Sequence, residues 1–269
     1  MKTIVINVLL IVTGLLTVLP LIWMVSASFM PTGEATIYPP RFLPSQPTLL
    51  HYRELFTRMN FGRDFANSMI IAAGTTLFSL LLNSMAGYAF AKLRFGSRDR
   101  LFNVLVAALV IPTQVGMLPL FLMLKSVRLV NSYWGVILPS MATIFGIFLI
   151  RQFMVSIPDD LIDAARIDGA SEWRIYWSII LPLARPVLVT LAIFAFMSAW
   201  NDFMWPLIVL TDNAKYTLPV AVANLVGEHV QDTELMMASS VLTILPVLLL
   251  FLVLQRHYIA GIMVGSVKG

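Results

Sequence analysis

Apolar residues run along this sequence in long stretches, and the charged residues gather between them. A helix needs about 20 apolar residues to cross the hydrocarbon core of a bilayer. The pattern predicts six spans, at residues 4–29, 69–92, 101–124, 133–153, 186–210 and 237–254. An apolar soluble core would instead show amphipathic stripes, with a charge every few residues. We therefore expect an all-α integral membrane protein built as one transmembrane domain over residues 1–269.

Prolines interrupt most of these predicted spans. They lie at Pro20, Pro112, Pro119, Pro139 and Pro246. Lipid-embedded helices tolerate proline where neighbouring helices satisfy the freed backbone groups. We therefore expect kinked helices packed against one another. The limits of the fifth span are the hardest to place, because proline stands near both of its ends.

Composition agrees with a membrane protein and narrows its chemistry. Charged residues make up 12% of the chain, about half of the quarter that is usual in soluble proteins. The sequence has no cysteine, which excludes disulfides, thiolate metal ligands and cysteine nucleophiles. His51, His229 and His257 lie far apart and show no metal-ligand spacing. These features predict no metal site and no catalytic residue.

The net charge is +4, and its Lys and Arg flank the apolar runs. Orientation in the membrane therefore explains this charge better than a nucleic-acid partner would. Counted with the adjoining span ends, the N-terminal residues and the segments 92–100, 151–185 and 255–269 hold 11 Lys and Arg, whereas the alternate segments, which are longer in total, hold 7. Positive residues favour the cytoplasmic side. We therefore expect both termini to be cytoplasmic and the chain to be a multi-pass protein of a prokaryotic inner membrane.

The first apolar run could also be interpreted as a cleaved signal peptide, because Val25-Ser26-Ala27 has the small residues of a cleavage site. A signal peptide has an apolar core of about 7–15 residues. The run from Ile4 to Phe29 contains no charge and is much longer. Its length favours an uncleaved span.

Two of the predicted outside segments are long. Residues 30–66 are rich in proline and should form an extended loop with a short helix near residues 52–59. Residues 211–236 are more acidic and are also predicted as loop. Exposed loops of this length usually bind a partner or pack over the mouth of a protein.

The segment at residues 154–185, which is predicted to be cytoplasmic, is also predicted to be helical although it lies between two spans. Pro158 suits the first position of a helix, and Asp159 and Asp160 favour its positive N-terminal end. Gly169 can adopt the left-handed conformation that ends a helix. Ser171 is a plausible N-cap for a second helical stretch over residues 172–180. Pro182 and Pro186 mark the return to the membrane.

A helix–turn–helix under a membrane domain has two interpretations. It could be an interfacial segment with Trp173, Tyr176 and Trp177 at the headgroups. It could also dock a cytoplasmic partner, because the small Ala164 and Ala165 allow close approach and Asp163 and Arg166 place charges at the edge. The residues alone leave both interpretations open.

The same segment resembles the signature of the permease subunits of binding-protein-dependent ABC importers, E-A-A-x3-G-x9-I-x-L-P. The matching residues are Asp163, Ala164, Ala165, Gly169, Ile179, Leu181 and Pro182. The spacing is matched throughout. Asp163 is the one departure, since the family usually has Glu there.

Weaker matches follow one another along nearly the whole chain. They comprise residues 28–34 and 38–40, residues 86–92, residues 199–203 with 206–207, and the ending at residues 254–269. Each is similar to maltose-type sugar permeases at its own place, and the ending is similar to the shorter, MalG-type subunit. The chain is thus identified as similar to that family, with the type I importer permease fold.

This resemblance implies a set of partners. A second, similar permease would complete a heterodimer, two ATPase subunits would bind ATP and Mg²⁺ below it, and an extracytoplasmic binding protein would deliver a sugar. This chain would itself hold no cofactor. The matched residues of the 154–185 segment would form the coupling helix on the ATPase. The tail, at Gly265, Lys268 and Gly269, would also contact the ATPases.

Polar residues within the spans are candidates for the translocation path, because each is costly in lipid and tends to face the interior. They are Asn83, Gln114, Asn201 and Asp202, with Trp200 and Phe203 as aromatic neighbours and Ser140 and Thr143 in the fourth span. Asn83 and Gln114 could instead form interhelical hydrogen bonds, which we favour. The partner permease could also hold the substrate alone.

Other functions fit the sequence less well. An ABC permease for a polyol or glycerol phosphate would share the same coupling segment. An ion-driven transporter often carries acids at mid-membrane, whereas Asp202 is the only acid in these spans. The sequence contains no selectivity filter and no Arg-rich voltage sensor of a channel. It also lacks a G-x-x-x-x-G-K-[ST] loop, which would bind the phosphates of ATP.

Overall fold

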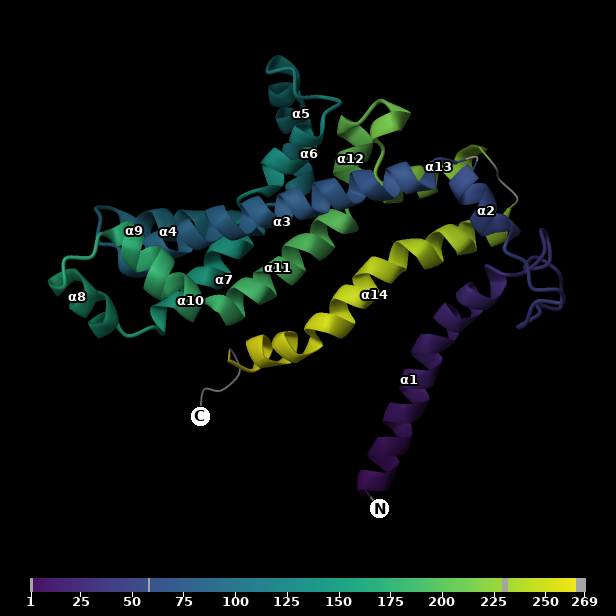
Figure 1. Ribbon diagram of the computed structural model, residues 1–269, viewed down its shortest axis with the longest axis horizontal. Helices are drawn as coiled ribbons and strands as arrows, with labels where there is room; N and C mark the ends of the chain where they lie inside the picture. Colours follow the sequence, from purple (N-terminus) through teal and green to yellow (C-terminus); the bar gives the residue numbers. More distant parts are fainter. Residues whose placement is uncertain (1, 58, 229–231, 265–269) are drawn as a thin grey trace. The chain divides into compact units, whose positions relative to one another are not determined.

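The computed structural model describes residues 2–57, 59–228 and 232–264, and within these ranges every regular element is helical (Figure 1). The helices are α1 (Lys2–Ala27), α2 (Leu50–Thr57), α3 (Phe61–Lys92), α4 (Arg98–Ala107), η1 (Ala108–Val110), η2 (Thr113–Gly116), α5 (Met117–Ser126), α6 (Tyr133–Ser140), α7 (Ile144–Val155), α8 (Asp159–Ile167), α9 (Glu172–Ile175), η3 (Tyr176–Ile180), α10 (Leu181–Leu183), α11 (Arg185–Trp200), α12 (Met204–Val209), η4 (Asn213–Lys215), α13 (Leu218–Glu228) and α14 (Thr233–Val264). The all-α prediction is confirmed.

In the described part of the chain, α1, α3 and α14 are each long and apolar enough to cross a membrane unbroken. Three bent helix pairs raise the number to six if each pair is one span: 98–110 with 113–126, 133–140 with 144–155, and 172–183 with 185–200. Their bends are 98°, 41° and 79°. The prolines therefore mark breaks as well as kinks.

The span predicted at 101–124 is broken in the structure into two helical stretches, 98–110 and 113–126. Ile111 has an extended backbone because the following proline disfavours the α conformation. Pro112 is extended too, and the chain turns before η2. The span predicted at 186–210 is likewise divided, since α11 ends at Trp200 and α12 begins at Met204.

The segment at 211–236 is not simply loop. It contains η4 and the eleven-residue helix α13. Pro219 lies in the first turn of α13, where a missing backbone N–H is harmless. The helix predicted near 52–59 is present as α2, which begins two residues earlier.

The chain forms two compact units. One comprises the described residues of 1–66 and 217–249, and the other those of 67–216 and 250–269. In the first unit, the loop after α1 is tied to the start of α14, since Ala35 N donates to Glu234 Oε1 at 2.7 Å. Ser28 and Tyr52 share a hydrogen bond of 2.8 Å that ties α2 to the end of α1.

Two apolar clusters organise the second unit. One joins α3 and α7 to η3 and α11 through Tyr88, Ile150, Tyr176 and Leu191. The other joins α3 to α5, α6 and α12. Gly87 allows the close approach of α3 and α7, because a Cβ there would lie 2.4 Å from Ile150 Cγ2.

Candidate coupling and translocation sites

The α8–α9 turn is closed by backbone hydrogen bonds that its sequence favours. Gly169 has φ +78°, the left-handed conformation that glycine tolerates best. Gly169 N donates to Arg166 O at 3.0 Å and Ala170 N to Ala165 O at 2.9 Å. This is the pair of bonds of a Schellman motif. Pro158 lies one residue before the helix, at the N-cap, not at its first position as the sequence suggested.

The next turn confirms the predicted cap. The Ser171 side chain accepts a hydrogen bond from Arg174 N at 3.4 Å. The backbone then continues through α9, the π-helical turn η3 and α10. The chain bends by 79° between this stretch and α11. Ile179 is half-buried, and Leu181 packs against the apolar cluster of α3 and α7, whereas Pro182 is exposed.

Helix α8 divides its residues between two faces. Ile162 is buried in the same apolar cluster as Ile175 and Ile180. Ala165 is half-buried and packs on that cluster. On the opposite side Asp163 and Ala164 are exposed.

Four large apolar side chains are also exposed on α8, α9 and η3. They are Leu161, Ile167, Trp173 and Trp177. Ile167 is exposed to 86%, although an apolar side chain gains free energy when it is buried. The segment thus combines a packed inner face with an exposed outer face that carries large apolar side chains.

Polar contacts fix α8 to the membrane helices. Lys92, at the end of α3, is only 4% exposed, and its Nζ lies 2.6 Å from Asp159 Oδ1 and 2.5 Å from Ile157 O. The hydrogen bond from Lys92 holds the pKa of Asp159 below its usual range. This contact joins the first turn of α8 to α3 (Figure 1).

A second polar chain ties the end of α8 to the start of α9. Arg166 donates to Asp163 Oδ1 at 3.0 Å and to Glu172 Oε1 at 2.8 Å. Tyr88 OH, on α3, donates to the other oxygen of Glu172 at 2.7 Å. Because one carboxylate receives both donors, α8, α9 and α3 are linked in a single network.

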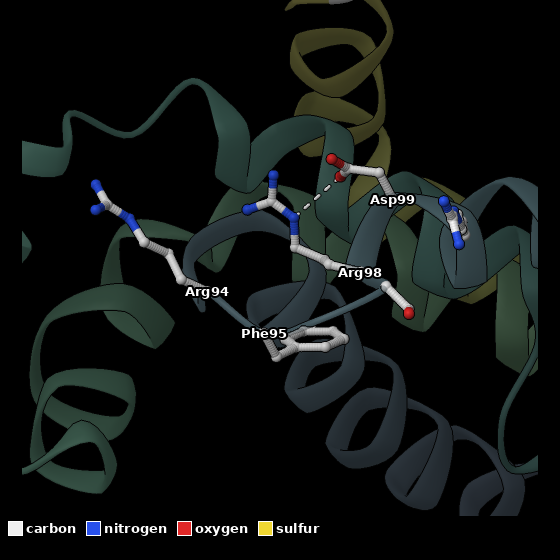
Figure 2. Close-up of a pocket in the computed structure, with 6 residues that line it drawn as sticks. Arg94, Phe95, Arg98 and Asp99 are labelled. Carbon is white, nitrogen blue, oxygen red and sulfur yellow. Dashed lines mark hydrogen bonds and ion pairs between the residues drawn. The ribbon is translucent and has the colours of Figure 1, made fainter.

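An arginine-rich turn follows the same end of α3. Figure 2 shows Arg94, Phe95, Arg98 and Asp99 around a pocket, with Arg98 paired to Asp99 at 3.0 Å. Ser97 lies in the left-handed conformation just before α4. These cations lie in a segment that the distribution of Lys and Arg predicts to be cytoplasmic, as α8 is.

The second unit also holds a cavity of about 730 Å³ between its broken helices. Its polar lining consists of Thr75, Ser79, Thr113, Gln114, Ser140, Thr143, Ser198 and Asp202. Phe145 and Phe194 line it as well and meet edge to face, with centroids 5.6 Å apart. The structure thus places Gln114 and Asp202 on one cavity, as candidates for the translocation path.

Four other predicted path residues do not line this cavity. Asn83 is fully buried, donating to Ser79 Oγ at 2.7 Å and accepting from Thr143 N at 2.9 Å. The bond from Thr143 N, at the N-cap of α7, is an interhelical bond of the kind that we favoured, whereas the bond to Ser79 lies within α3. Trp200 is 1% exposed and stacks on Phe196, so its face is covered. Asn201 donates to Met197 O at 2.9 Å, and Phe203 is half-buried.

The tail residues Gly265, Lys268 and Gly269 lie outside the described residues. Among residues that sequence reasoning did not single out as functional, Lys92, Tyr88 and Glu172 form the anchoring network. Two signals pointed to the first two of them: Lys92 ends an apolar span, and residues 86–92 are similar to the maltose-type permeases. The partner of that lysine could not be read from a single sequence.

Comparisons with known proteins bear on this arrangement. The family described as the inner membrane component of binding-protein-dependent transport systems matches residues 83–263. The chain belongs to this family. It is therefore a transport permease and not itself an enzyme, and its fold is that of type I importer permeases.

Individual relatives agree with the family. The chain is 39% identical to the arabinooligosaccharides transport system permease protein AraQ of Halalkalibacterium halodurans, over 94% of this chain and 92% of that protein. It is also similar to a chain in the crystal structure of a bacterial ABC transporter that imports alginate, with TM-score 0.86 and 25% identity over 96% of each chain. A second alginate transporter structure, in complex with a periplasmic protein holding alginate pentasaccharide, matches with TM-score 0.63 and 17% identity over 96% of this chain and 95% of that one.

Proposed function

We propose that this permease is one of two membrane subunits of an ATP-driven importer for a sugar or oligosaccharide. A similar second permease would complete the translocation path, and two ATPase subunits would bind ATP and Mg²⁺ on the cytoplasmic side. An extracytoplasmic binding protein would deliver the substrate. The carbohydrate relatives support this substrate class. The lack of a phosphate-binding loop in the sequence supports a separate energy source.

The α8–α9 segment would transmit the movement of the ATPase. One observation carries this role: α8 exposes an apolar and small-residue face while Lys92 and the Arg166–Glu172–Tyr88 network fix its other side. An anchored helix transmits displacement because its packed core resists deformation. ATP can drive transport only if it binds one global state of the complex better than the other. With six spans and the α8–α9 segment on the cytoplasmic side, both termini would also be cytoplasmic.

The cavity of Gln114 and Asp202 would form part of the substrate path. Its hydroxyl, amide and carboxylate groups can exchange hydrogen bonds with sugar hydroxyls, and Phe145 and Phe194 offer apolar ring surface. Trp200 is not proposed as a stacking platform, because its ring is covered. A site on the second permease could hold the sugar alongside or instead of this cavity.

The test is a bulky substitution on the outer face of α8. Ala164→Phe should leave insertion and pairing with the second permease intact, because Ala164 is exposed in this subunit. It should abolish capture of the ATPase subunits and ATP-dependent sugar uptake in proteoliposomes. Ala165 is a poorer choice, since it packs on the apolar cluster and a larger side chain there would disturb the fold itself.

The matched control is Ala214→Phe, at an exposed alanine far from this segment, which should keep the ATPases bound. Normal ATPase capture and normal uptake with Ala164→Phe would contradict the docking role. Full uptake by the wild-type chain alone, driven by an ion gradient, would contradict the whole proposal. Uptake of a polyol or glycerol phosphate in place of sugar would correct the substrate class only.

A further inference from the structure

His51 occupies an unusual position on α2 in the first unit. Its ring is fully buried, and its Nε2 lies 3.0 Å from Met30 O. A carbonyl oxygen only accepts hydrogen bonds, so Nε2 must carry the proton. In the neutral ring, Nδ1 then presents its lone pair. Among the described residues, Nδ1 has no hydrogen-bond partner.

The atom that Nδ1 faces is also an acceptor. Asp232 Oδ1 lies 3.6 Å away, and this oxygen already accepts a hydrogen bond from Leu235 N at 2.9 Å as the cap of α14. Two electron pairs so close in a buried site repel unless a positive charge lies between them. The geometry therefore favours a positive charge at this point, which either a proton on Nδ1 or a metal ion would supply.

A third ligand comes from the same helix. Glu54 is one turn after His51 on α2, and one ligand atom from each of His51, Glu54 and Asp232 lies within 4.8 Å of the others. Metal ligands at about 2.0–2.1 Å in a tetrahedral site are separated by roughly 3.3 Å. The separation of His51 Nδ1 and Asp232 Oδ1 is close to that value and longer than the roughly 2.7–2.9 Å of a charge-assisted hydrogen bond.

We propose that His51 Nδ1 and the carboxylates of Glu54 and Asp232 bind one divalent cation of the zinc class. One imidazole and two carboxylates form a ligand set that zinc accepts, with the fourth position left to water. The bond from His51 Nε2 to Met30 O is the outer contact that orients a metal-bound imidazole. The ion would tie α2 to the beginning of α14, two segments of the first unit that are far apart in the sequence.

This site differs from what the sequence led us to expect. The absence of a metal site was predicted from the lack of cysteine and from the spacing of the three histidines. Here a single histidine meets two acids, and one of those acids comes from a distant segment. No local motif could reveal this set.

The experiment uses the full-length permease with its co-purifying partners in detergent, prepared with an affinity tag that contains no histidine. The protein is stripped with a chelator and titrated with zinc chloride. Bound zinc is measured by mass spectrometry after dialysis, and thermal unfolding is followed in parallel. We expect one zinc per chain and a rise in Tm upon zinc addition.

Glu54→Gln and Asp232→Asn should each weaken zinc binding at least tenfold and abolish the rise in Tm. Asp232→Asn keeps a side chain that can cap α14, so loss of the helix start does not confound it. The control is Asp212→Asn, another capping aspartate, which accepts a hydrogen bond from Ala214 N. It should leave zinc binding unchanged.

Three outcomes would overturn the proposal. The wild type could bind no zinc, or both ligand variants could bind it as the wild type does. The chain could also ignore zinc but gain stability as the pH falls through the range in which imidazole titrates. That last result would place a proton on His51 Nδ1 in the position assigned to the metal.

Discussion

The coupling segment and the translocation cavity are built from the same helices in opposite ways. At the segment 154–185, Asp159 pairs with Lys92 of α3, Arg166 of α8 pairs with Glu172 of α9, and apolar residues close the space between these elements. Around the cavity the helices are broken, and its one carboxylate, on Asp202, bonds to Trp205 N in its own turn. Ion pairs join separate helices in the coupling segment, whereas the one carboxylate of the cavity bonds only within its own turn.

The difference fits two mechanical demands. A part that transmits displacement must not absorb it, and the ion pairs of Asp159 and Arg166 each tie α8 to a second element. A part through which a solute passes must change shape, and helix breaks permit this because backbone rotations concentrate there. We therefore expect changes to the segment to reduce coupling, and changes to the cavity to alter substrate affinity.

The largest effect is expected from Lys92→Met. Methionine keeps much of the side-chain length but leaves Ile157 O without its buried donor and Asp159 without its partner. The loss should be roughly 1–2 kcal/mol, because Asp159 is 72% exposed and recovers water. We expect ATP-driven uptake to fall by about five- to thirtyfold, measured in proteoliposomes containing the assembled complex.

Lys125→Met provides the control for Lys92, since Lys125 is an exposed lysine at the end of α5. It should leave uptake within about twofold of the wild type. Equal losses for the two lysine variants would show that Lys92 has no special role in the segment.

A smaller effect is expected from Tyr88→Phe. The substitution removes the hydrogen bond to Glu172, which keeps Arg166 as a partner. A loss of about 1 kcal/mol should loosen α9 from α3. Tyr133→Phe is the matched variant, because Tyr133 OH donates to Asn67 Oδ1 at the same distance of 2.7 Å. Both should lower Tm similarly, and only Tyr88→Phe should reduce the ATPase activity coupled to uptake.

The Lys92–Asp159 contact should be insensitive to pH in the neutral range. Its hydrogen bond lowers the pKa of Asp159 in the folded state. The stability that it contributes is therefore present above the unfolded value of about 3.9 and is lost as the pH falls through the lower, folded value. The Tm difference between wild type and Asp159→Asn should be constant from pH 5 to 8, begin to shrink near pH 4 and vanish only below the folded pKa of Asp159. A difference that already disappears near pH 6 would contradict the assignment.

Much of the coupling segment could be predicted from the sequence because its information is local. Gly169 and Ser171 determine the turn through backbone geometry and a cap within a few residues of one another. The helix that follows Ser171 was expected for the same reason. The partner of Lys92 lies far along the chain at Asp159, and no local rule joins them.

The cavity was less predictable, because its lining depends on contacts between residues that are far apart in the sequence. Asn83, Asn201 and Gln114 are amides within apolar runs, and the sequence could not separate their roles. The amide of Asn83 forms hydrogen bonds with Ser79 and Thr143, and that of Asn201 bonds to Met197 O at the end of α11. Gln114, in contrast, lines the cavity. Trp200 was predicted as an aromatic neighbour of the path, but its ring stacks on Phe196 and does not line the cavity. Which face of a broken helix points inward depends on the bend, and the bend is not encoded by periodicity.

The smallest effect, and the sharpest test of the contrast, is expected from Gln114→Ala. If the amide bonds a passing sugar, its loss should cost about 0.5–1.5 kcal/mol, which is about a two- to tenfold rise in the KM for uptake. ATPase binding should not change, because Gln114 lines the cavity and takes no part in the polar contacts that fix the coupling segment. Val115→Ala alters the neighbouring exposed residue, which does not line the cavity, and should leave the KM unchanged. A reduced maximal rate at unchanged KM in Gln114→Ala would instead indicate that the cavity wall contributes to coupling, and the division between the two regions would fail.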